Sequence, residues 1–234
     1  MENSQKQQVR RHFIKQASAL ALSFSALPAV AKLIKTKASV DKTPPLPADM
    51  VFEFVGVSHG NIKRVKEMLE KVPTLINATW DWAAGDFETA LGGASHMGRQ
   101  DIANYLLEKG ARKDIYCAAM LGEKKLVQSF IKTDPSIANT LGPHKYTLLY
   151  HVAISKNIDM AKIVKLHITD TGANFNQALH AAVRNNDTEM AEWLLKNGVN
   201  DPNTGDFARN RPLQNAEKNG FNAMGKLLKE HGAI

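Results

Sequence analysis

Residues 89–112 carry a hydrophobic pattern that predicts two short helices folded back on each other. Small and apolar residues occupy one face of the first half, and Gly98 interrupts the pattern. Ile102, Leu106 and Leu107 then form an apolar stripe at helical spacing in the second half. A helix pair this short cannot bury its apolar faces alone, so the pattern is expected to recur in neighbouring units.

The pattern does recur along the chain. Each copy has an apolar residue two positions after its start, small residues near five and six, a Gly or Asn near nine, and an apolar second helix. The copies begin at positions 51, 89, 113, 147, 177 and 211, so the successive starts differ by 38, 24, 34, 30 and 34 residues. Alternating β-branched runs are nearly absent, which argues against a sheet protein.

Three of these copies resemble the ankyrin repeat, whose period is about 33 residues and whose motif is T-P-L-H-x-A. The motif is carried, with departures, by Thr89–Ala94, Gln177–Ala182 and Arg211–Ala216. The resemblance covers roughly residues 48–234. It implies an all-α solenoid of about six helix-turn-helix units, some of which lack the β-hairpin finger. It also implies a non-enzymatic module that binds another protein through a concave groove.

Residues 1–31 are expected to be a signal peptide. Val9–Lys15 matches the twin-arginine export pattern, a mild apolar stretch follows, and Ala29–Ala31 offers a small-x-small cleavage site. That stretch is too short to span a bilayer, which needs about 20 residues. The alternatives are a disordered tail with a chance arginine pair and a mitochondrial transit peptide. Twin-arginine export predicts a periplasmic protein without stable membrane insertion after cleavage.

Residues 32–47 form a predicted Pro-containing linker, in which Thr43–Pro47 cannot be helical. The repeat domain is then expected to span residues 48–234, with Asp49 as the cap of its first helix.

The charge balance argues against nucleic-acid binding. The whole chain has a net charge of +7, and residues 1–31 contribute +3, so the remainder carries +4. These charges are dispersed along the predicted second helices instead of forming a concentrated basic stripe.

Motifs of enzymatic chemistry are absent from the sequence. It has no G-x-S-x-G, no Gly-rich phosphate loop, no H-E-x-x-H and no Cys–His metal spacing. The eight histidines are therefore expected to be structural or surface residues, without a metal or cofactor. His96 is expected to be exposed, and the resemblance gives His180 a role in hydrogen bonding between repeats. The lone Cys117 is predicted to be a buried hydrophobe.

The resemblance places the recognition surface on the finger tips and on the exposed ends of the first helices. At the central units these ends are apolar, at Met120, Leu121 and Ile154, and exposed apolar clusters mark contacts. The 38-residue step holds an extended finger at 79–88 with Trp80 and Trp82, one of which is expected to pack inward and the other to bind. The 24-residue step leaves no room for a finger, so the groove is expected to be open near Met120.

The predicted protein-binding residues are drawn from these segments. They are Trp80, Trp82, Asp86, Phe87, His96, Met97, Met120, Leu121, Tyr146, Ile154, Arg184 and Asn185. The partner is expected to be another protein, and the chain itself is expected to be monomeric. Two alternatives stay open at this point: an exported hydrolase that uses Asp81, Asp86 and His96, and a purely structural or stress-protective role.

Overall fold

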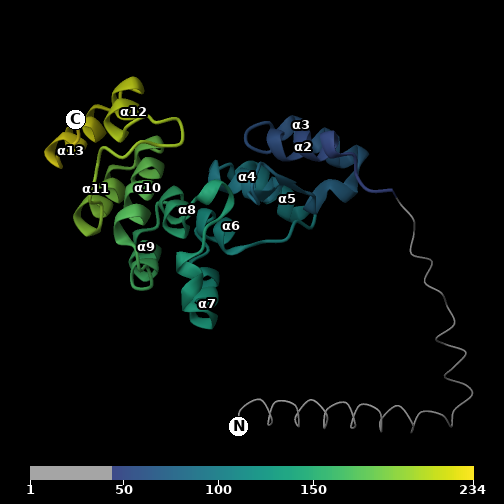
Figure 1. Cartoon of the computed structure of the whole chain (residues 1–234), viewed down its shortest axis with the longest axis horizontal. Coiled ribbons are helices and arrows are strands. Elements are labelled where there is room, and N and C mark those ends of the chain that lie inside the picture. Colours follow the sequence, from purple (N-terminus) through teal and green to yellow (C-terminus); the bar gives the residue numbers. More distant parts are fainter. Residues whose placement is uncertain (1–43) are drawn as a thin grey trace, which may run out of the picture. The chain divides into compact units, whose positions relative to one another are not determined.

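The computed structural model describes residues 44–234, which include the whole of a compact unit from Leu46 to Ile234. The predicted signal peptide and residues 32–43 of the predicted linker lie outside the described residues. Pro44–Pro47 have no regular secondary structure, and the first described helix follows them directly (Figure 1).

Twelve helices within residues 44–234 form six consecutive helix pairs (Figure 1). The pairs are α2 (Ala48–Val57) with α3 (Ile62–Lys71), α4 (Ala90–His96) with α5 (Gln100–Glu108), α6 (Ile115–Met120) with α7 (Lys124–Thr133), α8 (Leu148–Ile154) with α9 (Ile158–Lys165), α10 (Thr171–Arg184) with α11 (Thr188–Asn197), and α12 (Pro212–Lys218) with α13 (Asn222–Glu230). The first helices pack in succession, and each is backed by its own second helix. The predicted all-α repeat architecture is therefore confirmed.

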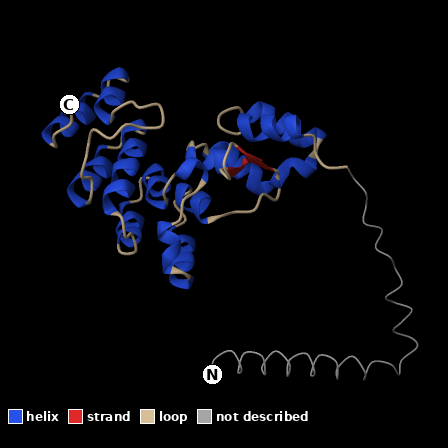
Figure 2. Cartoon of the chain, in the orientation of Figure 1, coloured by secondary structure: helices blue, strands red, loops and turns tan. Residues whose placement is uncertain are grey.

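The connections between pairs are of two kinds. Before α4, strands β1 (Thr79–Asp81) and β2 (Phe87–Thr89) form an antiparallel hairpin, seen in red in Figure 2. The short 3₁₀ turn η1 (Pro73–Asn77) precedes this hairpin in the same connection. Two further turns, η2 (Pro135–Asn139) and η3 (Pro143–Lys145), lie between α7 and α8, where a single bridge joins Leu141 to Thr147. Residues 109–114 contain no strand, as the 24-residue step predicts.

Side-chain caps explain where several helices begin. Thr89, Asp114 and Thr147 each accept a hydrogen bond from the backbone N–H three residues later. Each cap satisfies one of the backbone donors that a helix leaves free at its N-terminus. These three residues therefore fix where the first helices α4, α6 and α8 begin.

The first helix begins at Ala48 as expected, but its predicted cap and the predicted start of the fifth unit are wrong. Pro47 precedes the first helix, so Asp49 lies inside the first turn and is not the cap. The fifth pair begins at Thr171 instead of 177, because Asp170 caps the chain by accepting from the N–H of Ala173. The additional helical residues at the start of α10, 171–176, therefore occupy the part of the repeat in which other units carry a finger.

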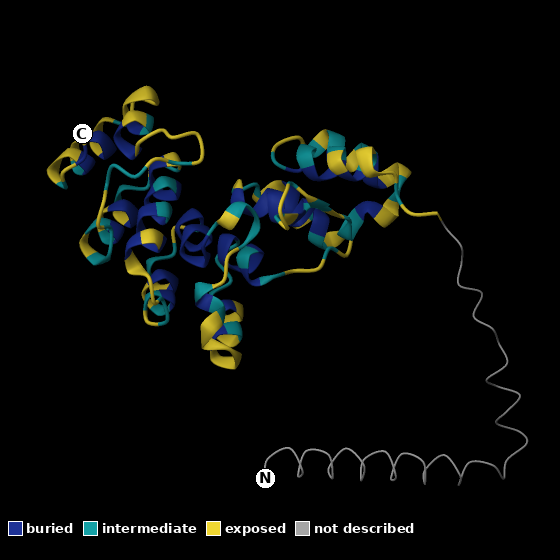
Figure 3. Ribbon diagram, viewed as in Figure 1, coloured by how far each residue is buried: buried dark blue, intermediate teal, exposed yellow. Residues whose placement is uncertain are grey.

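The core lies between the helices of successive pairs (Figure 3). First helices are covered by neighbours on several sides, which explains their small residues, such as Ala118 and Ala119. The same packing buries Met120 and Ile154, so the prediction that these two residues are exposed is wrong. In residues 44–234, no helix combines the length and the apolar character needed to cross a membrane.

Candidate functional site

Four side chains converge near the finger of the second repeat, and we call them the His–Glu cluster: His59, Glu88, His96 and His144. His59 follows α2, Glu88 is the middle residue of β2, His96 ends α4, and His144 lies in η3. The ends of two first helices, α2 and α4, and the two connections that precede α4 and α8 therefore contribute to one place. The cluster is the only group of this kind that the described residues contain.

The polar atoms of the cluster are close together. His59 Nε2 lies 3.1 Å from His96 Nε2 and 3.3 Å from Glu88 Oε2. The other carboxylate oxygen, Oε1, lies 2.9 Å from His96 Nε2, and His144 Nε2 lies 3.5 Å from Oε2. One atom can be chosen from each residue so that all four lie within 4.8 Å of one another.

Glu88 is a buried carboxylate surrounded by imidazoles. Burial by itself would raise the pKa of Glu88, but His59 and His96 outweigh it and lower the pKa to about 2. Burial lowers the pKa of His96, and Glu88 offsets only part of that effect. For His59 burial also acts downward, yet its contacts with Glu88 raise the pKa overall. At neutral pH the Glu88 carboxylate is therefore ionised, and it is buried among the imidazole rings of the cluster.

A ring of outer partners orients these side chains. His59 Nδ1 lies 3.1 Å from the carbonyls of Val55 and Gly56, and because carbonyls only accept, Nδ1 carries the hydrogen. Asp86 accepts from the backbone N–H of His144 at 2.8 Å and from its Nδ1 at 2.9 Å. The indole of Trp82 donates to Glu88 Oε2 at 2.7 Å.

His96 is oriented differently from the other two rings. Its Nδ1 has no hydrogen-bond partner among the described residues, and its ring stacks on Tyr146 at 5.2 Å between centroids. Its backbone carbonyl accepts from Tyr150 Oη and from Arg184 Nη2, each at 3.1 Å. Two residues of later repeats thereby hold the end of α4.

Two glycines make room for the cluster, and Gly92 stands where the ankyrin motif has His. A Cβ on Gly93 would lie 2.6 Å from Ser58 Oγ and 3.0 Å from a carbon of the His59 ring. A Cβ on Gly92 would lie 3.2 Å from Pro143 and 3.3 Å from a side-chain carbon of Glu88. Both glycines are therefore explained by the close approach of cluster residues and their neighbours.

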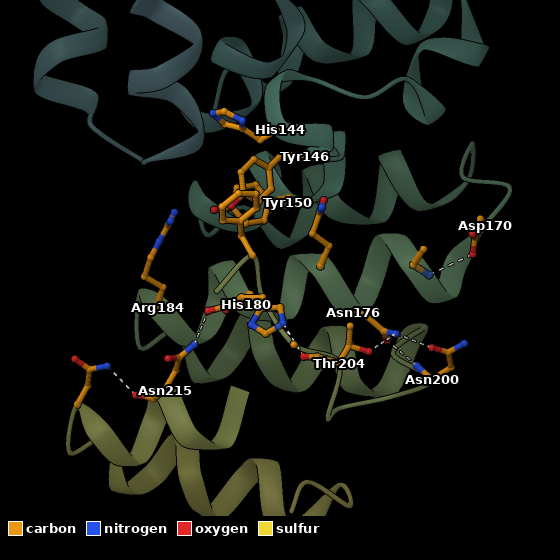
Figure 4. Close-up of a pocket in the computed structure, with 16 residues that line it drawn as sticks. His144, Tyr146, Tyr150, Asp170, Asn176, His180, Arg184, Asn200, Thr204 and Asn215 are labelled. Atoms are coloured by element: carbon orange, nitrogen blue, oxygen red, sulfur yellow. Dashed lines mark hydrogen bonds between the residues drawn. The ribbon is translucent and has the colours of Figure 1, made fainter. Parts of the chain in front are cut away.

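A groove of about 840 Å³ begins beside the cluster, because His144 lines it as well. Figure 4 shows His144, Tyr146 and Tyr150 at one end of it, with the two tyrosine rings stacked at 4.1 Å. Asn176, Thr204 and Asn200 form a hydrogen-bonded group at another part of its wall. Phe207, which is 88 % exposed, also lines the groove.

The two finger tryptophans both pack inward. Trp80 and Trp82 are each half-buried and meet the ring of Phe52 edge-on, at 5.2 and 5.6 Å between centroids. The prediction that one of them is exposed for binding is wrong, because the hairpin lies against α2. Phe87 at 62 % and Met97 at 40 % are exposed, as expected.

The other predicted residues fall into separate places. Tyr146 and Arg184 line the groove, whereas Leu121 and Asn185 are half-buried and do not. His96 is 4 % exposed, which corrects the expectation of a surface position. Met120 and Ile154 are buried in the core, so the open part of the groove lies along the fourth to sixth repeats instead.

The remaining histidines and the cysteine have structural surroundings. His180 Nε2 lies 2.9 Å from the carbonyl of Thr204, a contact between repeats of the kind predicted for it. His151 is completely buried, and burial raises the pKa of Cys117 to about 11. Asp81 accepts a hydrogen bond from the N–H of Gly85 and is exposed, so the predicted Asp81, Asp86 and His96 group does not assemble.

Sequence reasoning missed His59, Glu88 and His144 as members of one site, and Phe207 as a groove residue. The available signal was the pair of glycines at 92 and 93, the first of which replaces the His of the motif. Glycines there indicate that other groups approach the helix closely.

Comparison with known proteins gives one result on the family. A family model described as ankyrin repeats in three copies matches residues 115–206 and 151–234. Together these matches span residues 115–234, just over half of the chain. A search of curated proteins returned no match to this sequence.

Proposed function

The chain belongs to the ankyrin-repeat family, a protein-interaction fold, and from this premise we propose that it is an exported, non-enzymatic binding module. In this proposal the groove holds a protruding segment of a partner protein. Protein binding is the general role of the fold, and here it is assigned to one surface, the groove, and to one compartment outside the cytoplasm.

The observation that carries the proposal is the arrangement of aromatic side chains at the groove. Phe207 is 88 % exposed on the loop between α11 and α12, and its ring lies 6.4 Å from that of His144. The stacked pair of Tyr146 and Tyr150 lines the same groove. Exposed aromatic residues beside a concave wall are typical of binding hot spots, because they bury a large area at low entropic cost.

Polar groups in the wall favour a peptide over a purely apolar ligand. Gln177, Asn215 and Asn219 bring amide donors and acceptors to the groove, and Asp206 brings a carboxylate. A peptide backbone presents both N–H and C=O groups, which such side chains can pair. Hydrogen bonds from the wall would then fix the register of a segment anchored by the aromatic residues.

Export is the second part of the proposal, and it is supported by the sequence of residues 9–15. The pattern of two arginines, a spacer, Phe13, Ile14 and Lys15 precedes an apolar stretch and a small-x-small site. We therefore place the partner among proteins of the bacterial periplasm.

Site-specific photocrosslinking tests the binding surface. A photoreactive phenylalanine analogue at position 207 is expected to form a defined adduct with a periplasmic protein, and Phe207→Asp is expected to abolish capture of that protein. Leu166 is 80 % exposed at the end of α9 and does not line the groove, so the same changes there are the matched control. Equal adducts at both positions, or capture unaffected by Phe207→Asp, would refute the proposed surface.

A further inference from the structure

The His–Glu cluster has the composition and spacing of a transition-metal site. Three imidazoles and one carboxylate form a ligand set suited to Zn²⁺. Metal–ligand bonds of about 2.0–2.1 Å place tetrahedral ligand atoms about 3.3–3.4 Å apart. His59 Nε2 lies 3.1 Å from His96 Nε2 and 3.3 Å from Glu88 Oε2, and His144 Nε2 lies 3.5 Å from the same oxygen. With one atom taken from each residue, all four ligand atoms lie within 4.8 Å of one another, close enough for one ion to draw them together.

Hydrogen bonds between the cluster residues do not satisfy every buried polar atom of the cluster. Glu88 has a side chain with no exposed surface, and within residues 44–234 its Oε1 has no hydrogen-bond partner although His96 Nε2 is 2.9 Å away. A hydrogen bond requires the N–H to point at its acceptor, whereas a metal requires lone pairs to converge on one point. An unpaired buried carboxylate oxygen is costly, so its retention indicates another partner.

The outer hydrogen bonds set the ring tautomers that metal binding needs. The Val55 and Gly56 carbonyls hold the hydrogen of His59 on Nδ1, and the Asp86 carboxylate does the same for His144. In each neutral ring Nε2 then carries the lone pair, and Nε2 is the atom that faces the cluster. A carboxylate behind a histidine is a common outer partner in zinc sites, where it fixes the ring and increases its basicity.

We propose that His59, Glu88, His96 and His144 bind one Zn²⁺ ion in a closed, four-coordinate structural site. The ion joins the end of the first repeat, the finger and first helix of the second, and the loop that precedes the fourth. It thereby fixes that loop over the third repeat, which has no finger of its own. The site shares His144 with the wall of the proposed peptide groove, but metal binding does not depend on a partner.

Metal analysis of the full-length chain tests this proposal. After removal of metal with a chelator and dialysis, the protein is expected to take up one Zn²⁺ per chain. His144→Ala is the principal variant, because His144 lies in the short turn η3 and not in one of the packed helices. Glu88→Gln is the second, and both are expected to weaken Zn²⁺ binding by more than about 100-fold, beyond the range known for outer partners.

Asp86→Asn separates a metal site from a simple hydrogen-bond network. The asparagine oxygen can still accept from the backbone N–H of His144, but its NH₂ group cannot accept from Nδ1–H. We expect Zn²⁺ affinity to fall by about 10–100-fold while the circular dichroism spectrum is unchanged. His167→Ala removes an imidazole outside the cluster and is the control, with affinity unchanged.

Co²⁺ provides a direct readout of the geometry. Bound in place of Zn²⁺, it is expected to give the intense visible absorption of a four-coordinate ion, and His144→Ala is expected to remove that absorption. Less than one tenth of an ion per chain, binding that His144→Ala and Glu88→Gln leave unchanged, or the weak spectrum of six-coordinate Co²⁺ would each overturn the proposal. None of these results bears on crosslinking at Phe207, so the two proposals can fail separately.

Discussion

Asp86 accepts two hydrogen bonds from His144, one from its backbone N–H at 2.8 Å and one from Nδ1 at 2.9 Å, across 58 positions of sequence. His144 and Lys145 both have positive φ angles, 55° and 59°, which non-glycine residues adopt infrequently. The carboxylate on the second-repeat finger therefore holds a tight turn that precedes the fourth repeat.

Asp86→Ala is expected to release this turn. Two charge-assisted hydrogen bonds are lost from partly exposed groups, so the free energy of unfolding should fall by about 1–3 kcal/mol. Trypsin should also cleave faster after the exposed Lys145, as followed by mass spectrometry in the presence of a chelator. Asp81→Ala, on the same finger, should change stability by less than about 0.5 kcal/mol. Equal cleavage rates in the two variants would contradict this account.

Gly93→Ala is expected to destabilise the protein through a steric clash. The new Cβ would lie 2.6 Å from Ser58 Oγ and would press on the His59 ring, a cost of about 1–3 kcal/mol. Gly56 is the matched control, because it is also helical and a Cβ there meets nothing within 4 Å. Gly56→Ala should stabilise by about 0.5–1 kcal/mol. Urea unfolding of both variants gives the comparison, and the same sign for both would refute the clash.

His151 is expected to make the protein sensitive to acid. Its complete burial lowers its pKa to about 3, and the nearby His96 and Arg184 act in the same direction against the Thr147 carbonyl. Nδ1 donates to that carbonyl at 2.8 Å, whereas Nε2 finds no partner in the part of the chain that the structure describes. Because the unfolded chain takes up this proton near the ordinary pKa of about 6.5, stability falls as the pH drops from about 6.5 towards 3.

The magnitude of this effect is on the order of a few kcal/mol. His151→Asn keeps an N–H donor but cannot be protonated in this range, so its stability should depend less steeply on pH between 6.5 and 4. Urea unfolding at several pH values measures the slope. Parallel slopes for the wild type and the variant would show that His151 is not the group responsible.

Replacing Arg10 and Arg11 by lysine is expected to leave the precursor in the cytoplasm. The twin-arginine route reads the arginine pair itself, so charge alone should not suffice. Fractionation and immunoblotting of bacterial cells measure the distribution. Lysine at Arg209 and Arg211, far from the amino terminus, is the control and should not alter it. Normal periplasmic yield of the first variant would refute the assignment.

The repeat architecture could be predicted because each unit carries its own local signal. Apolar spacing within a unit marks its two helices, and residues such as Thr89 and Thr147 mark where a first helix starts. The fifth unit was less predictable, since Asp170 is a strong cap seven residues before the expected start at Gln177. The apolar and small residues that matched the repeat pattern begin only after Gln177, so the pattern did not reveal the earlier helix start.

The His–Glu cluster could not be predicted because it depends on contacts between repeats. His96 stands at the end of a first helix, where the family pattern favours exposure, but the loop carrying His144 and Tyr146 covers it. Nothing in the spacing of His59, Glu88 and His144 indicates that the loop folds back this far. Met120 and Ile154 were misjudged for a related reason: Ile154 lies against Gly98, where a Cβ would be only 3.0 Å away.

The backbone carbonyl of His96 accepts hydrogen bonds from both Tyr150 and Arg184, and these bonds should change the order in which the repeats unfold. In an ideal solenoid each repeat contacts only its neighbours, so melting can start anywhere and spread one unit at a time. Here hydrogen bonds join the second repeat directly to the fourth and the fifth, which are not its neighbours. The first five units should therefore lose their amide protection against hydrogen exchange together, while α12 and α13 fray ahead of them.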